Sequence, residues 1–402
     1  MDTSLAWLYE EEGAYRRQTG EPLWSISDWH NDPGDIALPT TMLAGLRVDA
    51  VSMSRYRFLD TVNSTKGHIG SFYRCYCGVN LDPESFALCS NGTAALTLSI
   101  RCLAEQGVRR MLVLTPAYFS LFKVLDSHGI TTIYMHSDLT DEIVLDVDRI
   151  LHIARHQMVD AVFITNPVFS TGLSLTPSSL RDLIKYAECT GTWLILDETL
   201  AGLPWHSGLQ SPFVTHGMHE ALQCSRSIYI WSVSKSLFLN GLKHSLVLAP
   251  APFVARLEKA ADMIVGGLTA HQVASAEQIY SDSNMQEIYQ CTRRNIAQFS
   301  ATYDLCATCL SRSPLKLTSV DSGFHTITFI PKLTANNAAV AQLLAATMIR
   351  RHGISIIPLA HFGFPQFSPI GFRINLSKNS SKLYDALFLL SEIIHKDPHL
   401  AH

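Results

Sequence analysis

The sequence lacks the long apolar runs and the basic excess that would assign it to a membrane or to nucleic acid. No uninterrupted apolar stretch approaches about eighteen residues, so we expect no membrane-spanning helix. Lysines and arginines total 31 against 35 aspartates and glutamates, which gives a formal net charge of −4. That balance argues against a nucleic-acid or membrane-surface protein, which would show a basic face. The opening residues are polar and acidic without a signal-peptide run, so we expect a cytoplasmic protein.

Cysteine is present but forms no metal-binding pattern. The nine cysteines are scattered: Cys75 and Cys77 lie two apart, and Cys306 and Cys309 form a single CxxC. No second pair and no nearby histidines accompany them, so we expect no metal site. The cysteines should be reduced and packed as small hydrophobic side chains.

Apolar residues are abundant, and their arrangement predicts the fold class. They make up 47% of the 402 residues, enough for a large core. From about 85 to 250, short runs that are apolar throughout alternate with helical patterns. This order predicts an α/β protein whose mainly parallel sheet is covered by helices. We expect residues 51–270 to form this large domain, with residues 271–402 forming an interdomain helix and a smaller α+β domain that the segment 1–50 joins.

Two of the predicted strand ends offer an anion site and an aromatic face. In "CSNGTAAL", Ser90 is expected to cap a helix, and Gly92 lets a bulky anion approach the backbone. Free N–H groups at that helix start would form a phosphate cradle, although an ordinary strand–turn–helix cap gives the same pattern. Tyr118, just past the next strand, could lie over a flat cofactor ring or pack as a core tyrosine.

Two further strand ends offer a carboxylate and an amine. Asp197 ends the run "WLILD", where a carboxylate needs a partner such as a protonated pyridine nitrogen; a helix cap or a metal ligand is the alternative. Lys235 follows "RSIYIW", where burial would make its amine a nucleophile towards carbonyls, unless it is a solvated surface lysine. Ser232 and Ser234 could hydrogen-bond an anion beside it. The four strand ends together fit the needs of pyridoxal 5′-phosphate (PLP).

With these motifs in this order, the sequence resembles the class I/II aminotransferase superfamily, the fold-type I PLP-dependent enzymes, over most of its length. The likeness of "SVSKSLFLNGLKHSLVLAP" and "LILDE" to family segments implies that Lys235 is the Schiff-base lysine and that Asp197 pairs with the pyridine nitrogen. Likewise, "GFRINLS" implies that Arg373 binds the substrate α-carboxylate, with a surface ion pair as the alternative. Further cofactor-binding residues that the resemblance implies are Gly92, Thr93, Tyr118, Ser232, Ser234, Lys243 and, towards the partner subunit's phosphate, Thr269. We also expect Asn166 and Phe169 at the cofactor.

The sequence departs from the family pattern in three places around the cofactor. The stretch "NPVFSTG" places Phe169 where the family has an asparagine, and Leu200 stands where it often has a tyrosine. Both usual residues donate to the ring hydroxyl O3′, so their loss predicts an imine that stays protonated and electrophilic at neutral pH. Lys243 replaces a phosphate-binding arginine: it keeps the positive charge but lacks the paired N–H donors of a guanidinium. The candidates for a substitute O3′ donor are Asn166, Thr171 and Thr199.

The resemblance implies a PLP-dependent enzyme that acts on an α-amino acid through Schiff-base and quinonoid intermediates. We expect an aminotransferase-like enzyme of specialised amino-acid or natural-product biosynthesis, because the usual O3′ donors are replaced. The alternative is elimination, replacement or ring closure, as in 1-aminocyclopropane-1-carboxylate synthase, with S-adenosylmethionine as one candidate substrate. A non-catalytic PLP-binding protein is disfavoured because Lys235 and Asp197 are both present, and a sugar-nucleotide aminotransferase is disfavoured by Arg373.

The resemblance also implies a homodimer with shared active sites that takes a small-molecule substrate. The stretch "SISDWHNDPGD" corresponds to N-terminal residues that lie over the substrate in the family, so Asp28, Trp29 and His30 could shape specificity. A packed N-terminal strap is the alternative. His68 and Tyr73 fall where a residue of the partner subunit often reaches the cofactor.

Overall fold

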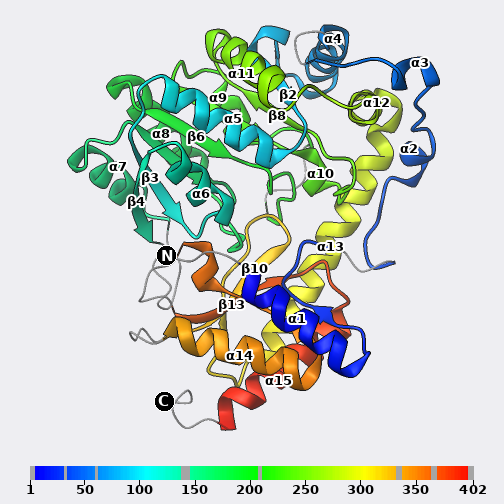
Figure 1. The fold of residues 1–402 in the computed structure, drawn as a ribbon, viewed down its shortest axis with the longest axis vertical. Helices are drawn as coiled ribbons and strands as arrows, with labels where there is room; N and C mark the ends of the chain where they lie inside the picture. Colours follow the sequence, from blue (N-terminus) through cyan, green and yellow to red (C-terminus); the bar gives the residue numbers. More distant parts are fainter. Residues whose placement is uncertain are drawn as a thin grey trace.

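The protein is built in two parts around two apolar cores, joined by the long helix α13 (Met285–Leu310) (Figure 1). In Figure 1 the part with the larger sheet lies above and the part with the smaller sheet lies below. Within the residues described, no helix is long and apolar enough to cross a membrane. The structure, a computed structural model, describes residues 5–30, 34–58, 62–136, 145–206, 211–331, 337–363 and 369–396.

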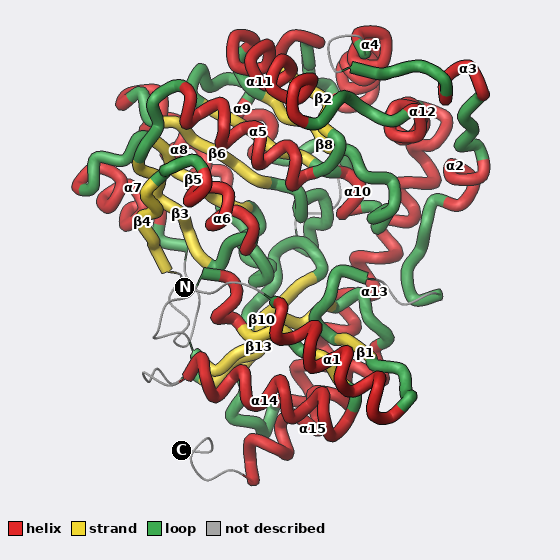
Figure 2. Tube along the Cα trace, viewed as in Figure 1, coloured by secondary structure: helices red, strands yellow, loops and turns green. Residues whose placement is uncertain are grey.

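The large sheet explains why its strands are apolar throughout. Its strands run in the order β2, β8, β7, β6, β5, β3, β4, and β8 is antiparallel to both of its neighbours while the other pairs are parallel. Every residue of β5, β6 and β7 is buried, because helices cover both faces of the sheet (Figure 2). The strands are β2 (Phe86–Cys89), β3 (Arg110–Thr115), β4 (Thr131–His136), β5 (Ala161–Thr165), β6 (Trp193–Asp197), β7 (Ser227–Trp231) and β8 (Ser245–Leu248).

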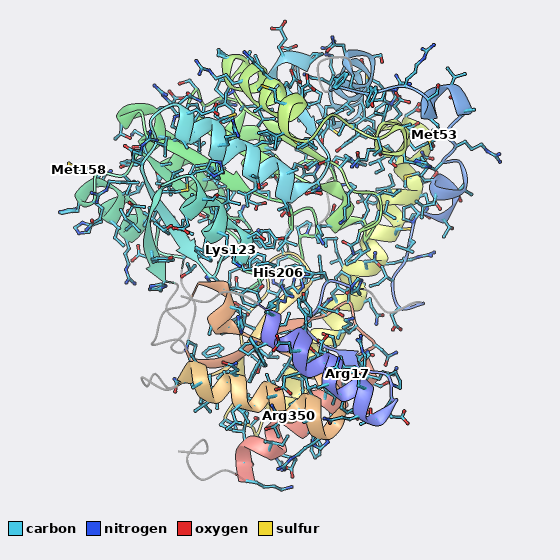
Figure 3. The ribbon with its side chains drawn as sticks, viewed as in Figure 1. Arg17, Met53, Lys123, Met158, His206 and Arg350 are labelled. Carbon is cyan, nitrogen blue, oxygen red and sulfur yellow. The ribbon has the colours of Figure 1, made fainter. Side chains whose placement is uncertain are left out.

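Helices flank the large sheet in two groups. One group, α5, α6 and α11, packs together against one face, and the other, α7, α8 and α9, packs against the opposite face. Met53 on α3 and Met158 after α7 are exposed and lie at opposite edges of this part (Figure 3). The helices of this part are α2 (Thr40–Ala44), α3 (Ala50–Met53), α4 (Asn63–Phe72), α5 (Gly92–Glu105), α6 (Phe119–Ser127), α7 (Val147–His156), α8 (Pro177–Thr190), α9 (His216–Ala221), α10 (Val233–Ser236), α11 (Ala251–Ile264) and α12 (Ala270–Ile279), with a π-helical turn Tyr73–Cys77 and 3-10 turns Pro83–Ser85 and Asp282–Asn284.

The small-sheet part combines the C-terminal chain with the first residues. Leu8 and Ile26 pack in the same core as the C-terminal strands and helices, while Met42 packs in the core of the large sheet. The proposed domain boundaries at residues 50 and 270 stay predictions. The small sheet is antiparallel in the order β12, β13, β10, β9, and β1 pairs with β11 beside it. The elements are α1 (Ala6–Thr19), β1 (Trp24–Ser25), β9 (Lys316–Leu317), β10 (His325–Ile330), α14 (Asn337–His352), β11 (Ile354–Ser355), β12 (Ile357–Pro358), a 3-10 turn (Leu359–Phe362), β13 (Ile370–Asn375) and α15 (Ser380–Lys396).

Phe238 carries an unusual backbone conformation for a bulky residue, with a φ of 58°. Its buried ring packs edge-on against Phe299 and Phe324, at centroid distances of 5.3 and 4.9 Å. We expect Phe238→Gly to lower the free energy of unfolding by about 2 kcal/mol, because lost packing (~3–5 kcal/mol) outweighs relieved strain (~1–3 kcal/mol). Phe238→Ala should be less stable still, since alanine keeps the strained φ. Urea unfolding measures both, and a glycine variant more stable than wild type would contradict this balance.

Candidate active site

A cavity of about 400 Å³ lies at the carboxyl edge of the large sheet. The parallel strands and the loops after them bring their polar ends to this edge, where α/β proteins bind ligands. The predicted site residues in its wall are Trp29, His30, Gly92, Thr93, Tyr118, Phe169, Asp197, Ser232, Lys235 and Lys243. The wall also contains Asn91, Leu96, Thr199, Leu200 and Asn240, of which Asn91, Leu96 and Asn240 were not anticipated from the sequence.

The start of α5 forms one end of the cavity, and its cap differs from the prediction. Asn91, rather than Ser90, caps the helix: its Oδ1 accepts a hydrogen bond from the Ala94 amide at 2.9 Å. Asparagine and serine are both good caps, so the sequence pattern did not separate the two positions. A Cβ on Gly92 would lie 3.3 Å from the Thr199 side chain, so glycine keeps this approach to the backbone open. Free amides at the helix start therefore face a site suited to a phosphate.

Three further side chains line this end of the cavity, and Gln272 supports it from outside the wall. The exposed Lys243 adds a cation, and the Thr93 and Tyr118 hydroxyls lie 3.3 Å apart. The Gln272 amide, which the sequence interpretation missed, donates to the carbonyls of Ser90 and Lys243 at 2.7 and 2.8 Å. Gln272 stands three residues after Thr269, in the capping-box position of α12, and this spacing was the available signal.

The Asp197 carboxylate is buried at the end of β6. Burial raises its pKa from 3.8 to about 6, with the Thr199 contacts opposing the shift. The Thr199 amide donates to Oδ1 at 3.1 Å, which is weak compensation for a buried charge. A protonated ring nitrogen in the cavity would supply the missing counter-charge, so this residue fits the predicted cofactor.

Lys235 lies in α10, directly after β7, with its side chain largely buried. Burial first, then the charges of Arg373 and Lys243, lower the pKa of its amine from 10.5 to about 8. Its Nζ donates to Oδ1 of Asn240 at 2.9 Å. Ser232 Oγ donates to the His244 carbonyl at 3.0 Å, while the side chain of Ser234 lies outside the described residues. A cavity-facing amine with a lowered pKa suits attack on an aldehyde.

Arg373 is fully buried in β13, which excludes the surface ion pair. Its Nε donates to the Ser27 carbonyl at 2.7 Å, and its Nη2 donates to the same oxygen. The Trp29 ring covers the guanidinium, with 3.8 Å between Cζ and the ring centroid. Burial lowers the pKa of Arg373 to about 9. Its Nη1 has no hydrogen-bond partner among the described residues, as expected for a group that awaits an anion.

The positions of the two replaced O3′ donors both face the cavity. Phe169 and Leu200 are buried in its wall, and the Phe169 ring contacts those of Trp29 and Tyr118 at centroid distances of 5.7 and 5.9 Å. Of the three candidates for a substitute O3′ donor, Thr199 is the one that lines this cavity. The cavity is therefore apolar on the side where the family has two donors.

Two candidate O3′ donors are turned away from the cavity. Asn166 Nδ2 donates to the buried Glu198 carboxylate at 2.6 Å, and its Oδ1 accepts from the Leu175 amide. These contacts hold the Asn166 amide in the wall of a second cavity of about 560 Å³. Thr171 Oγ1 donates to the Val168 carbonyl at 2.8 Å within the same turn. Neither residue lines the cofactor cavity in this chain.

The residues predicted to act across a subunit interface also lie outside the cavity. Tyr73 is buried, with its hydroxyl donating to the Phe213 carbonyl at 3.2 Å. His68 is exposed, with Nε2 3.3 Å from the Glu277 carbonyl oxygen. Thr269 is exposed and caps α12. The described residues contain no cluster of three metal-ligating side chains, and all nine cysteines are free.

The fold is that of the fold-type I PLP-dependent enzymes, as the sequence predicts. The sequence pattern of the family described as "Aminotransferase class I and II" matches residues 23–387. The chain therefore belongs to the aminotransferase class I and II family, whose members are enzymes that use PLP. The predicted family and fold class are confirmed.

Known proteins resemble the chain at two levels. A single mutant of aspartate aminotransferase from Thermus thermophilus shares the fold at a TM-score of 0.80 and 15% identity, over 98% of this chain and 97% of that one. Histidinol-phosphate aminotransferase of Chlorobium chlorochromatii is 26% identical over 192 residues, 46% of this chain and 47% of that protein. 1-Aminocyclopropane-1-carboxylate synthase 6 of Oryza sativa subsp. japonica is 27% identical over 206 residues, 48% of this chain and 38% of that protein. The chain thus matches about half or less of the length of the last two proteins, which were matched by sequence.

Replacing Lys243 with alanine should weaken PLP binding about tenfold, since a charge-assisted hydrogen bond is worth ~1.5 kcal/mol. Lys243→Arg should keep or improve the affinity, because the guanidinium fork matches a phosphate. Equilibrium titration of the apoprotein with PLP measures both, with Lys123→Ala, an exposed lysine on α6, as the control. Equal affinities for wild type and Lys243→Ala would remove Lys243 from the phosphate site.

Proposed function

We propose that the chain is a PLP-dependent, aminotransferase-like enzyme that acts on an α-amino acid. The observation that carries this proposal is that the amine of Lys235 and the buried carboxylate of Asp197 line one cavity. The cofactor, when bound, withdraws electrons from the Cα of the amino acid. Lys235 would tether the cofactor and carry protons, while Asp197 would hold the ring nitrogen protonated.

The remaining groups would bind the cofactor's phosphate and ring and the substrate's α-carboxylate. The start of α5 and Lys243 would hold the phosphate, with Tyr118 and Phe169 against the ring. Arg373 would take the α-carboxylate through its fork once the Trp29 ring moves aside, because that ring now covers the guanidinium. The strap over the cavity, residues 25–30, would then shape the substrate side of the site.

A second candidate is elimination, replacement or ring closure at the same site. The apolar Phe169 and Leu200 favour it, because they replace both O3′ donors that the family pattern supplies for transamination. The match to a 1-aminocyclopropane-1-carboxylate synthase is a second support. The proposed setting is specialised amino-acid or natural-product biosynthesis.

Single-turnover spectroscopy with a panel of amino acids separates the two candidates. Conversion of the bound cofactor to its amine form, with a keto acid released, supports transamination. A changed product with the aldehyde form regenerated supports the second candidate. Borohydride reduction followed by peptide mapping tests the shared premise, because the proposal fails if no pyridoxyl group is found on Lys235.

We also propose that the chain forms a homodimer through an apolar surface near Thr269. Val51, Met53 and Tyr56 are exposed before Arg57, and Met263 and Ile264 are exposed before Leu268. The two segments are joined by a hydrogen bond of 2.6 Å from the Leu268 amide to the Arg57 carbonyl. Light scattering should give twice the chain mass, and Ile264→Glu should shift it towards the monomer; an active monomer would contradict the proposal.

Nine free cysteines support a reducing, cytoplasmic location.

A further inference from the structure

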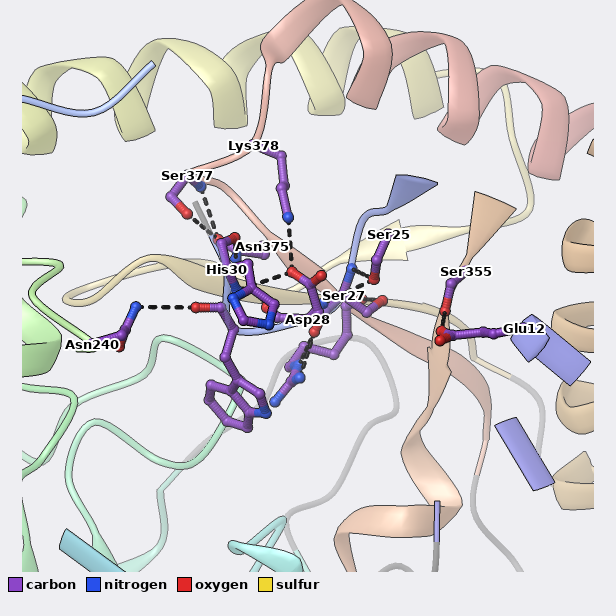
Figure 4. Close-up of polar contacts among 12 residues, drawn as sticks. Glu12, Ser25, Ser27, Asp28, His30, Asn240, Ser355, Asn375, Ser377 and Lys378 are labelled. Carbon is purple, nitrogen blue, oxygen red and sulfur yellow. Dashed lines mark hydrogen bonds and ion pairs between the residues drawn. The ribbon is translucent and has the colours of Figure 1, made fainter. Parts of the chain in front are cut away.

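Asn240 joins the reactive amine to the strap over the cavity. It follows Lys235 by five residues, and its side-chain amide uses both of its ends. Its Oδ1 accepts from Lys235 Nζ at 2.9 Å. Its Nδ2 donates to the Trp29 carbonyl at 3.2 Å, the bond drawn at Asn240 in Figure 4. The orientation of the amide is fixed by chemistry, because an ammonium group only donates and a carbonyl only accepts.

The strap is anchored to the small-sheet part by polar contacts of its own. Ser27 Oγ donates to the Arg373 carbonyl, and Asp28 forms an ion pair of 2.7 Å with the buried Lys378. Asn375 Nδ2 donates to the Asp28 carbonyl at 3.0 Å (Figure 4). Asn240, which comes from the loop after α10, therefore ties the other side of the strap to the segment that carries Lys235.

Trp29 gives this tie a consequence for the site. Its ring lies 3.8 Å from Arg373 Cζ and 5.2 Å from Lys235 Nζ, both measured to the ring centroid. The indole thus lies close both to the group proposed to bind the carboxylate and to the group proposed to move the proton. The hydrogen bond from Asn240 restrains the backbone segment that carries this ring.

We propose that Asn240 is a positioning residue: its side chain receives the Lys235 amine whenever that amine is not bonded to the cofactor, and at the same time holds the Trp29 backbone over the cavity. The inference rests on the proposed function. A neutral amide suits the first task, because it accepts a hydrogen bond from either the ammonium or the free amine and so does not lock the proton in place. A carboxylate at this position would favour the ammonium form strongly.

Two variants of nearly the same size separate these roles. Asn240→Asp keeps the acceptor, adds a charge and removes the donor to Trp29, while Asn240→Leu removes both bonds. Asn80→Leu, at an exposed asparagine, is the matched control. The titratable and charged groups around Lys235 are His30, Tyr118, Asp197, Lys243, His325 and Arg373, and all stay unchanged in these variants.

The first readout needs no turnover: the full chain without cofactor is labelled with acetic anhydride across a pH series, and modification at position 235 is mapped by mass spectrometry. We expect Asn240→Asp to move the labelling midpoint upward by about one pH unit, and Asn240→Leu to move it down. A merely structural role predicts the wild-type midpoint in both variants. Thermal melting curves show whether each variant is folded.

The second readout uses the enzyme loaded with PLP. We expect kcat to fall about 10–100-fold in both variants, because proton transfer depends on how well the amine is placed. Hydrogen exchange at residues 25–30 should also rise in both. The proposed function fails if wild type forms no borohydride-trapped adduct. If wild type forms the adduct but both Asn240 variants have the wild-type labelling midpoint and the wild-type exchange at residues 25–30, only the role of Asn240 fails.

Discussion

Replacing Lys235 with alanine should reduce turnover at least about 10³-fold, the largest effect expected of any single change in this chain. The variant loses both the tether for the cofactor and a positioned proton carrier, and the latter alone is worth about 10²–10⁴-fold. Added methylamine should restore part of the activity, because a small amine can enter the space that the side chain leaves. Steady-state rates with the amino acid identified by single-turnover spectroscopy measure the effect.

The control for this prediction is Lys123→Ala, which removes an exposed lysine from α6 and should leave the rate unchanged. Cofactor content must be determined in each preparation, since lysine loss also weakens PLP retention. A Lys235→Ala enzyme with more than about a tenth of wild-type activity would show that the proton moves through another group.

Replacing Asp197 with asparagine should have opposite effects on activity and on stability. Turnover should fall about 10²-fold, because a charge-assisted bond to a protonated ring nitrogen is worth up to ~3 kcal/mol. The apoprotein should become more stable by about 1–3 kcal/mol at about pH 8, since asparagine removes a buried charge yet can still accept the Thr199 amide.

The pH dependence of this gain follows from the raised pKa of Asp197. Its pKa is 3.8 as an ordinary value and about 6 in the folded protein, because the carboxylate is buried. Below about pH 4 Asp197 is protonated and does not lower the free energy of unfolding. The loss of stability grows as the pH rises and reaches its full size above about pH 6. Urea unfolding of the two apoproteins at about pH 4 and pH 8 tests this, with Asp126→Asn as an exposed control. An equal difference at both pH values would contradict the assignment.

The sequence was informative where a residue follows a fully buried strand. Asp197 is the last residue of β6, and Lys235 follows the end of β7 by four residues. All five residues of each strand are buried, so the chain pattern places both side chains at one edge of the sheet. The helix cap was harder, because Ser90 and Asn91 are adjacent and both suitable. Only the structure shows that the Asn91 side chain reaches the Ala94 amide.

Contacts between distant parts of the chain were beyond the sequence. Nothing near Asn166 indicates that its amide is used by Glu198, which follows the end of the neighbouring strand β6. The cover over Arg373 likewise depends on Trp29, far away in the chain, meeting a strand of the small sheet. Such pairings follow from how the two cores are placed, and local patterns of apolar residues carry no information about that placement.

The site draws its groups from both cores, and this has a mechanical consequence. Asp197 and the start of α5 belong to the large sheet, whereas Arg373 belongs to the small one. In the proposed function, an amino acid held between Lys235 and Arg373 would connect the two parts of the protein, which α13 otherwise links. A simple amine without a carboxylate would enter the same cavity but leave Arg373 unbound. Its binding should therefore stabilise the large-sheet part alone.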